Sequence, residues 1–189
     1  LPMSQKNLEL IRHSIAHLLD AAVNDLYPNA LPTIGQSIEN GFYYDFGNLK
    51  ISDADLPKIE EKMRELLPSW KEFTKEEKSP NEAAHHPVIV GNRYKKELVD
   101  EVVSRGETIT FYTSGEFTDL CRGGHAERPA KEIKANSFKL THLAGAYWRG
   151  DSKNPQLTRI YGVAFASKKE LDEYIAMLEE AKKRDHKKI

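Results

Sequence analysis

The stretch IRHSIAHLLDAAVNDL, residues 11–26, decides the fold of this chain. Its apolar residues recur every three or four positions, which is typical of the buried face of an amphipathic helix. The pattern extends from about Met3 to Tyr27, and Pro28 and Asn29 then end it. The apolar stripe consists of Leu8, Ile11, Ile15, Leu18, Leu19, Ala22 and Leu26. We therefore expect one long helix that packs its apolar face against the rest of the domain.

The segments that follow this helix carry both strand and helix patterns. Short aromatic, polar or alternating stretches predict strands over residues 41–47, 70–78, 109–113, 138–148 and 157–166. Helical spacing predicts helices over residues 56–67 and 92–104, the second with an inner face of Leu98, Val99, Val102 and Val103. A capping box of Ser79 and Glu82 predicts the start of a short helix over residues 79–85. Because the strands crowd in the second half, the order favours an α+β domain over a repeating βαβ unit.

A final helix is predicted from Ser167, where Glu170 completes a capping box. Its predicted packing residues are Leu171, Tyr174, Ile175 and Leu178. The tail over residues 182–188 is mostly charged and has no apolar stripe, which is typical of a linker. We expect one domain over residues 1–166 and a C-terminal linker helix over residues 167–189.

The composition excludes several classes of protein. The 189 residues include 28 Lys and Arg against 29 Asp and Glu, so the net charge is −1 and any nucleic-acid contact must be a local patch. No apolar run approaches the roughly 20 residues of a membrane span, and the first residues lack the layout of a signal peptide. The single cysteine, Cys121, cannot form an internal disulfide. We expect a cytoplasmic protein with no membrane partner.

Two histidines lie on the second face of the first helix. His13 and His17 are one turn apart, opposite the apolar stripe, and share their face with Glu9, Asp20 and Asn24. Such a face either meets solvent or lines a cleft. Two imidazoles at positions i and i+4 also suit a shared ligand.

A second cluster follows in DLCRGGH, residues 119–125. Its two consecutive glycines break regular structure, so Cys121 and His125 flank a tight turn. With His13 and His17 they supply the ligand types and number of a tetrahedral zinc site, although four protein ligands would close the shell against water. The same residues without metal can hold a water and a substrate by hydrogen bonds, with a neutral imidazole as base. Cys121 can also be a small core residue, or a nucleophile activated only by Arg122.

Aromatic and basic residues in the predicted strands have two interpretations. The aromatic ones can stack on a nucleic-acid base or belong to the core: Tyr43, Tyr44, Tyr147 and Trp148. Lys139, Arg149 and Arg159 can meet phosphate. His85 and His86, beside a proline, are predicted to be surface residues, and His142 has no motif around it.

Four stretches, in this order, resemble the editing domain of bacterial-type threonyl-tRNA synthetases, which is the second N-terminal domain of these enzymes. They are RHSIAHLL at residues 12–19, GFYYD at 41–45, DLCRGGH at 119–125 and AGAYWRGD at 144–151. The resemblance covers nearly the whole chain, and residues 184–188 resemble the linker that leads into the synthetase core. Position 124 differs from the family pattern: this sequence has Gly124 where the resemblance leads us to expect a proline. The implied fold is that of the threonyl and alanyl tRNA synthetase second additional domain, an α+β domain with a long central helix packed with antiparallel strands.

The resemblance implies an aminoacyl-tRNA deacylase. Its reaction is the hydrolysis of mischarged seryl-tRNA(Thr) by an activated water, and its partner is the acceptor end of tRNA(Thr). The synthetase core of the family is not in this sequence, so we expect no aminoacylation by this chain alone.

Seven site residues are implied by the same resemblance: His13, His17, Tyr44, Lys95, Asp119, Cys121 and His125. Lys95 follows Tyr94 in a pair similar to that of the family's catalytic lysine. His13 and Lys95 would position and polarise the attacking water, and Asp119 would bind the α-ammonium of serine.

The remaining residues are implied to complete the pocket. His17, Cys121 and His125 would hold the seryl hydroxyl and the terminal ribose, and Tyr44 would border the terminal adenosine. No cofactor is implied for editing, although the four His and Cys ligands permit zinc. A zinc-dependent alanyl-tRNA deacylase and a non-catalytic tRNA-binding module are the alternatives. Bound zinc would distinguish the first, and binding without ester cleavage the second.

Overall fold

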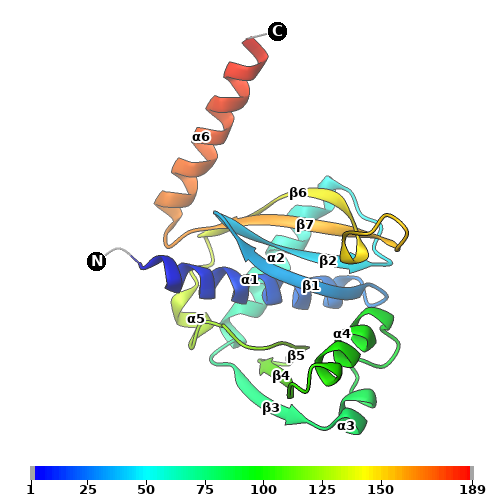
Figure 1. Cartoon of the computed structure of the whole chain (residues 1–189). Coiled ribbons are helices and arrows are strands. Elements are labelled where there is room, and N and C mark those ends of the chain that lie inside the picture. The colour runs from blue at the N-terminus through cyan, green and yellow to red at the C-terminus, as the bar shows by residue number, and fades with distance from the viewer. Residues whose placement is uncertain (1–2, 188–189) are drawn as a thin grey trace.

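The long helix α1 (Gln5–Leu26) forms as its apolar spacing predicts and runs through the middle of the domain (Figure 1). The structure, a computed structural model, describes residues 3–187, so residues 1–2 of the expected domain and residues 188–189 of the expected linker lie outside the described residues. Ser4 caps the helix by accepting a hydrogen bond from the backbone amide of Asn7. Ile15, Leu18 and Leu19 are completely buried, so α1 is the centre of the core.

The larger sheet has four antiparallel strands in the order β1-β2-β7-β6. These are β1 (Leu31–Ile38), β2 (Gly41–Gly47), β6 (Phe138–Tyr147) and β7 (Gln156–Ala164). The sequence did not predict β1, because Pro32 and Gly35 both disfavour a strand. As an edge strand β1 tolerates them, and its register shifts between these two residues.

The smaller sheet has the order β3-β4-β5. It contains β3 (Thr74–Lys78), β4 (Ile109–Ser114) and β5 (Phe117–Leu120). The strand predicted from Trp70 begins only at Thr74, since Trp70 is buried in the core instead. The four-residue strand β5 was also missed. In Figure 1, α1 lies between the two sheets, and this arrangement confirms the α+β class.

Shorter helices surround this framework. They are α2 (Leu56–Leu66), α3 (Pro80–Ala84), α4 (Arg93–Ser104) and α5 (Pro129–Glu132), with 3-10 turns at Asp53–Asp55, Leu67–Ser69 and Trp148–Gly150. The predicted capping box of Ser79 and Glu82 opens α3. One predicted core residue of α4 is wrong: Val103 is 42% exposed, because only one side of the helix meets the domain.

Helix α6 (Lys168–Lys187) extends away from both sheets (Figure 1). Its first turn is anchored by Leu171, which is buried. The predicted packing of Leu178 is wrong, since this residue is 37% exposed. No helix within residues 3–187 has the length and apolarity that a bilayer span requires.

We predict that Gly162→Ala destabilises the larger sheet. A Cβ at this position would lie 2.3 Å from Cζ of Phe42, which is fully buried and cannot move away. The free energy of unfolding in urea should fall by about 1–3 kcal/mol. In the control Gly145→Ala, the new Cβ meets only the flexible end of Gln156, so the loss should stay below about 0.5 kcal/mol. Equal losses in the two variants would contradict this account of the packing.

Candidate active site

The polar face of α1 lines a buried cluster rather than solvent. His17 is only 7% exposed and His13 is half-buried. Their Nε2 atoms lie 3.0 Å apart, so one ring can donate a hydrogen bond to the other. Of the two alternatives left open for this face, the structure shows the cleft.

The loop after β5 brings Cys121 and His125 to the same point. Gly123 and Gly124 have φ values of +109° and +90°, and this backbone turns the two side chains together. The sulfur of Cys121 lies 3.4 Å from Nε2 of His13 and 3.5 Å from Nε2 of His125. A proline at position 124 cannot adopt a positive φ, so this chain uses a loop conformation that the expected proline excludes.

Ser14 fixes this loop to α1. Its hydroxyl donates to the carbonyl of Leu10 and accepts a 2.9 Å hydrogen bond from the amide of Ala126, directly after His125. The imidazole of His125 also stacks on Phe73, with ring centroids 4.1 Å apart. The tight turn predicted from the two glycines is therefore held against the helix that carries His13.

The four predicted ligands fit a zinc ion. The candidate ligand atoms of His13, His17, Cys121 and His125 all lie within 4.8 Å of one another. Nδ1 of His17 lies 3.1 Å from Oδ2 of Asp119, a contact that orients the Nε2 of that ring toward the cluster, as in many metal sites. The same four groups also satisfy one another by hydrogen bonds, so the arrangement suits either state.

Asp119 joins this cluster to a buried lysine. Its Oδ1 accepts hydrogen bonds from Nζ of Lys95 at 2.9 Å and from the amide of Leu120 at 2.8 Å. Its Oδ2 faces Nδ1 of His17 and accepts a 2.9 Å hydrogen bond from the hydroxyl of Tyr44. These four partners occupy the whole hydrogen-bonding capacity of a carboxylate.

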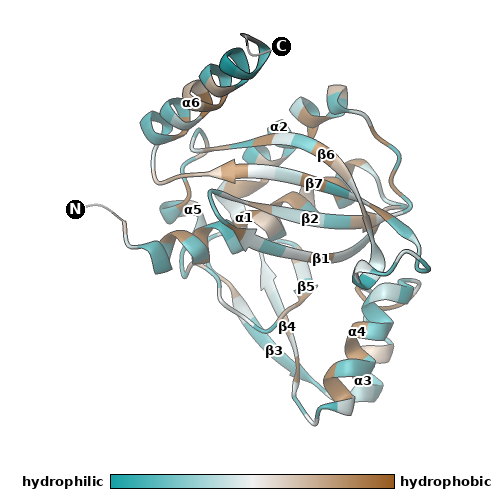
Figure 2. Cartoon of the chain, turned by 45° about the horizontal axis from the view of Figure 1, so that its top comes forward, coloured by the Kyte–Doolittle hydropathy of each residue, from teal (hydrophilic) through white to brown (hydrophobic). Residues whose placement is uncertain are grey.

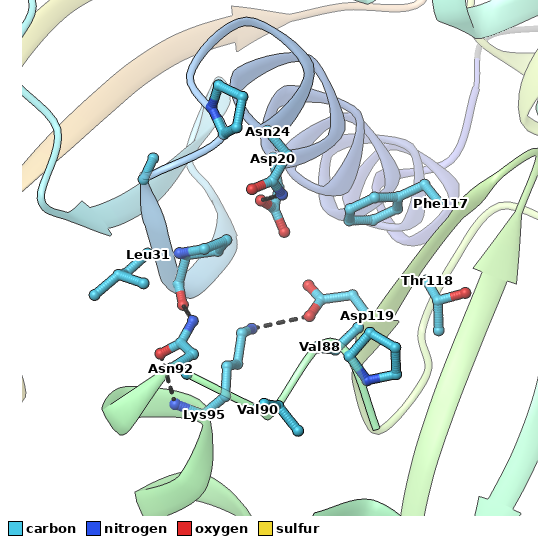
Figure 3. A pocket seen from close by; sticks show the side chains of 15 residues that line it. Asp20, Asn24, Leu31, Val88, Val90, Asn92, Lys95, Phe117, Thr118 and Asp119 are labelled. Carbon is cyan, nitrogen blue, oxygen red and sulfur yellow. Dashed lines mark hydrogen bonds and ion pairs between the residues drawn. The ribbon is translucent and has the colours of Figure 1, made fainter. Parts of the chain in front are cut away.

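Tyr44 and Lys95 complete this network. The Tyr44 hydroxyl accepts a 3.0 Å hydrogen bond from Nζ of Lys95, and the two side chains are 1% and 2% exposed. Figure 3 shows the ion pair of Lys95 and Asp119 beside Asp20 and Asn24. All seven predicted site residues thus converge in space, although His13 reaches Lys95 only through His17 and Asp119.

Two further polar residues were not predicted as part of the site. Asn92 caps α4 by accepting hydrogen bonds from the amides of Tyr94 and Lys95, and it donates to the carbonyl of Pro32 in β1. It therefore fixes the position of Lys95. Its signal in the sequence was its place at the start of the predicted helix.

Asp20 is the second of these residues. It is almost completely buried and accepts a 2.7 Å hydrogen bond from Asn24. Burial and the nearby charge of Asp119 raise the pKa of Asp20 well above its usual range. Its signal was its position on the helix face that carries His13 and His17.

The charges in the cluster stabilise one another. Burial opposes ionisation of Asp119, but the charge of Lys95 and the hydrogen bond from His17 outweigh it and lower the pKa of Asp119. Burial likewise disfavours a thiolate, yet hydrogen bonds from His125, His13 and His17 lower the pKa of Cys121 to about 3. Burial lowers the pKa of His17, but hydrogen bonds with Asp119 and Cys121 and their charges raise it to about 10. Near neutral pH the cluster therefore holds a thiolate beside an imidazolium.

The network separates two cavities. The larger, about 530 Å³, lies between β1, α4 and the loop after β5, and is lined by His13, Gly35, Gln36 and Cys121. The smaller, about 320 Å³, is lined by Lys95, Asp119 and Asp20 (Figure 3). The larger has a volume typical of a site for a small organic group.

The other candidates from the sequence lie elsewhere. Trp148 is buried against Tyr94, so it is a core residue. His85 is exposed as predicted, and His86 stacks on Phe111. Of the four aromatic residues with two interpretations, Tyr44 and Trp148 are therefore core residues, whereas Tyr43 and Tyr147 are not in the core.

We predict that Cys121 reacts as a thiolate even in mild acid. With a pKa of about 3, its alkylation by iodoacetamide should change little between pH 5 and pH 9 in chelator-treated protein. The protein denatured in guanidinium chloride is the control, and its rate should rise up to a pH of about 8.5. A folded protein that shows the same rise would contradict the thiolate–imidazolium pair.

Comparison with known proteins gives the family to which this chain is similar. Residues 109–161 match the family model described as "Threonyl and Alanyl tRNA synthetase second additional domain". Threonine–tRNA ligase of Burkholderia lata is 50% identical over 183 residues, which are 96% of this chain and 28% of the relative. The same enzyme of Francisella philomiragia is 49% identical over 185 residues, 97% of this chain and 28% of the relative.

A third relative, threonine–tRNA ligase of Brucella canis, is 51% identical over 183 residues and is covered over 27% of its length. The chain therefore spans little more than a quarter of the curated relatives that it matches. These matches confirm the resemblance carried by the sequence motifs: residues 109–161 match the second additional domain of threonyl and alanyl tRNA synthetases, and nearly the whole chain is similar to one part of threonine–tRNA ligases.

Proposed function

We propose that this chain hydrolyses the ester of mischarged seryl-tRNA(Thr), as the editing part of a threonyl-tRNA synthetase. The observation that carries the proposal is the continuous network from Lys95 through Asp119 and His17 to His13 and Cys121, at the edge of a cavity of about 530 Å³. Its partners would be the acceptor end of tRNA(Thr) and a synthetase core, and its compartment the cytoplasm.

Selection of threonine over serine creates the need for such a site. A pocket that prefers a substrate with one more methyl gains only about 1–3 kcal/mol, so a single pocket lets some serine through. A second pocket that accepts serine but not threonine multiplies the selectivity of the first.

The ester would enter the larger cavity, where His13 and Cys121 are accessible. His17, Cys121 and His125 would hold the seryl hydroxyl and the terminal ribose. Tyr44 is too deeply buried to border the terminal adenosine, so its proposed role changes: its hydroxyl holds Lys95 and Asp119 in place.

Recognition of the α-ammonium by Asp119 would require an exchange. All hydrogen-bonding positions of Asp119 are occupied, and one of them holds the ammonium of Lys95. The substrate's ammonium carries the same charge and can take that place, which keeps the charge of Asp119 paired, while Lys95 keeps its hydrogen bond to the Tyr44 hydroxyl. The displaced Lys95 would then be free to face the attacking water.

Hydrolysis would follow with His13 and Lys95 positioning and polarising this water. The water oxygen attacks the carbonyl carbon of serine, and one water proton passes to a base of the cluster. The bond between that carbon and the ribose oxygen breaks, and the oxygen receives a proton. General acid–base help of this kind contributes about 10²- to 10⁴-fold.

Zinc, if bound, would be held by His13, His17, Cys121 and His125 and would supply Lewis-acid polarisation. With all four protein ligands engaged, no position of a tetrahedral shell stays open. We therefore assign the positioning and polarising of the attacking water to the side chains.

The proposal predicts a preference for seryl esters in single-turnover deacylation. The unmodified chain should cleave seryl-tRNA(Thr) about 100-fold faster than threonyl-tRNA(Thr), because the extra methyl displaces the ester by about 1 Å from the held water. Alanyl-tRNA(Ala) is the third substrate. Equal rates on the seryl and threonyl esters, or a preference for the alanyl ester, would contradict the proposal.

His13→Ala and Lys95→Ala should each lower the seryl rate by about 10²- to 10⁴-fold while tRNA affinity stays nearly unchanged. Lys96→Ala, the exposed neighbour, and His86→Ala, outside the site, are the matched controls. Circular dichroism checks that each variant folds, since removing Lys95 leaves Asp119 without its cation. Full activity in both site variants would refute these roles.

We also predict that deacylation survives exhaustive chelation. In this proposal the side chains hold the water, so removal of a metal should change the rate less than about twofold. Metal analysis before and after treatment is the control. A rate that disappears with chelator and returns with zinc would favour the alanyl type of deacylase.

A further inference from the structure

A transverse row of side chains crosses the outer face of the larger sheet. Gln36 of β1 pairs with Tyr43 of β2, Tyr43 pairs with Tyr161 of β7, and Tyr161 pairs with His142 of β6. Successive residues of a strand point to opposite faces, and the neighbouring Tyr44 is buried on the face that meets α1. The four side chains, here called the aromatic row, therefore lie on the opposite face from α1.

The rings of the aromatic row lie against one another and are partly accessible to solvent. His142 stacks on Tyr161 with ring centroids 4.6 Å apart and planes within 15°, and the Tyr43 and Tyr161 centroids are 6.0 Å apart. The guanidinium of Arg159 lies 4.0 Å from the centre of the Tyr43 ring. His142 and Gln36 are exposed, and both tyrosines are half-buried. In Figures 1 and 2, α1 and α2 lie on one side of this sheet.

Asp45 determines the kind of partner that suits this face. It holds Arg159 in a two-pronged ion pair with distances of 2.7 and 2.9 Å, so the strongest cation beside the row is already neutralised. The hydrogen bond with Asp45 is the main cause that raises the pKa of Arg159 further. What the face offers is therefore ring surface, which suits stacking better than binding of phosphate.

The aromatic row begins at the proposed active site. Gln36 belongs both to the row and to the lining of the larger cavity, at the free edge of β1. With neighbouring strands about 4.8 Å apart, the row leads roughly 14 Å from that edge to His142. A strand of RNA whose last residue occupies the cavity has to leave it across the cavity's rim, and Gln36 is on that rim.

We infer that the aromatic row binds, by base stacking, the unpaired nucleotides that precede the terminal adenosine of the tRNA. The inference rests on the proposed function, since that function puts the terminal adenosine in the larger cavity. Single-stranded RNA is commonly held by aromatic side chains on an exposed sheet, because every base has a face that can stack. The row would thus hold the strand while the ester reacts.

The test compares two RNAs in a binding titration with the whole chain: intact tRNA(Thr), and tRNA(Thr) without its unpaired 3′ nucleotides. Tyr161→Leu should bind the intact tRNA about tenfold more weakly, the expected effect of one lost stack, and leave binding of the shortened tRNA unchanged. His142→Ala should act in the same direction. Tyr161→Phe keeps the ring and should bind like the unmodified chain, which controls for loss of folding.

Tyr174→Leu is the matched control, because Tyr174 of α6 is a half-buried tyrosine that packs on Phe165, away from the row. It should leave both affinities unchanged. The inference is overturned if Tyr161→Leu binds intact tRNA normally, if it weakens both RNAs equally, or if Tyr174→Leu has the same effect.

A second substrate separates this inference from the proposed function. Seryl-adenosine contains only the part that enters the cavity, so Tyr161→Leu should hydrolyse it at the normal rate and lose efficiency only on seryl-tRNA(Thr). An unmodified chain that hydrolyses neither ester refutes the proposed function. The comparison of the two tRNAs then still decides whether the row binds RNA.

Discussion

The buried ion pair of Lys95 and Asp119 is the interaction on which the site depends. Burying either charge alone would cost several kcal/mol, so each needs the other and the hydrogen bonds around them. Asp119 meets this need by bonding to four separate segments: α1, β2, α4 and its own strand. The relative placement of helix and sheets is thereby tied to the geometry of the site.

Much of the fold follows from the sequence because helices and paired strands leave periodic patterns. The stripe of α1 and the capping box of α3 are local signals, and both are confirmed. The strands β1 and β5 have no such signal. Pro32 and Gly35 are tolerated in β1 only because a sheet edge accepts an irregular strand, and the four residues of β5 are too few for a period. These elements depend on tertiary contacts that no local pattern records.

Site residues that occur in pairs with a recognisable spacing could be predicted from the sequence, whereas site residues that occur singly could not. His13, His17, Cys121 and His125 could be grouped from their spacing and residue types alone. Lys95 and Asp119 were assigned only through family resemblance, since a single lysine or aspartate carries no pattern. Asn92 and Asp20 were missed, because their importance lies in what they touch: the backbone that carries Lys95, and the side chain of Asn24.

The separation of 102 positions between His17 and Asp119 has a consequence for synthesis of the protein. A ribosome adds about 5–20 residues per second, so α1 exists for roughly 5–20 s before its carboxylate partner leaves the exit tunnel. During that interval His17 has no Asp119 to hold its proton, whereas the apolar stripe of α1 can already pack on β1, β2 and α2, which precede residue 119. The nascent chain can therefore assemble much of its hydrophobic core before its polar site, and a product truncated before residue 119 would retain part of the core but lack the carboxylate that joins His17 to Lys95.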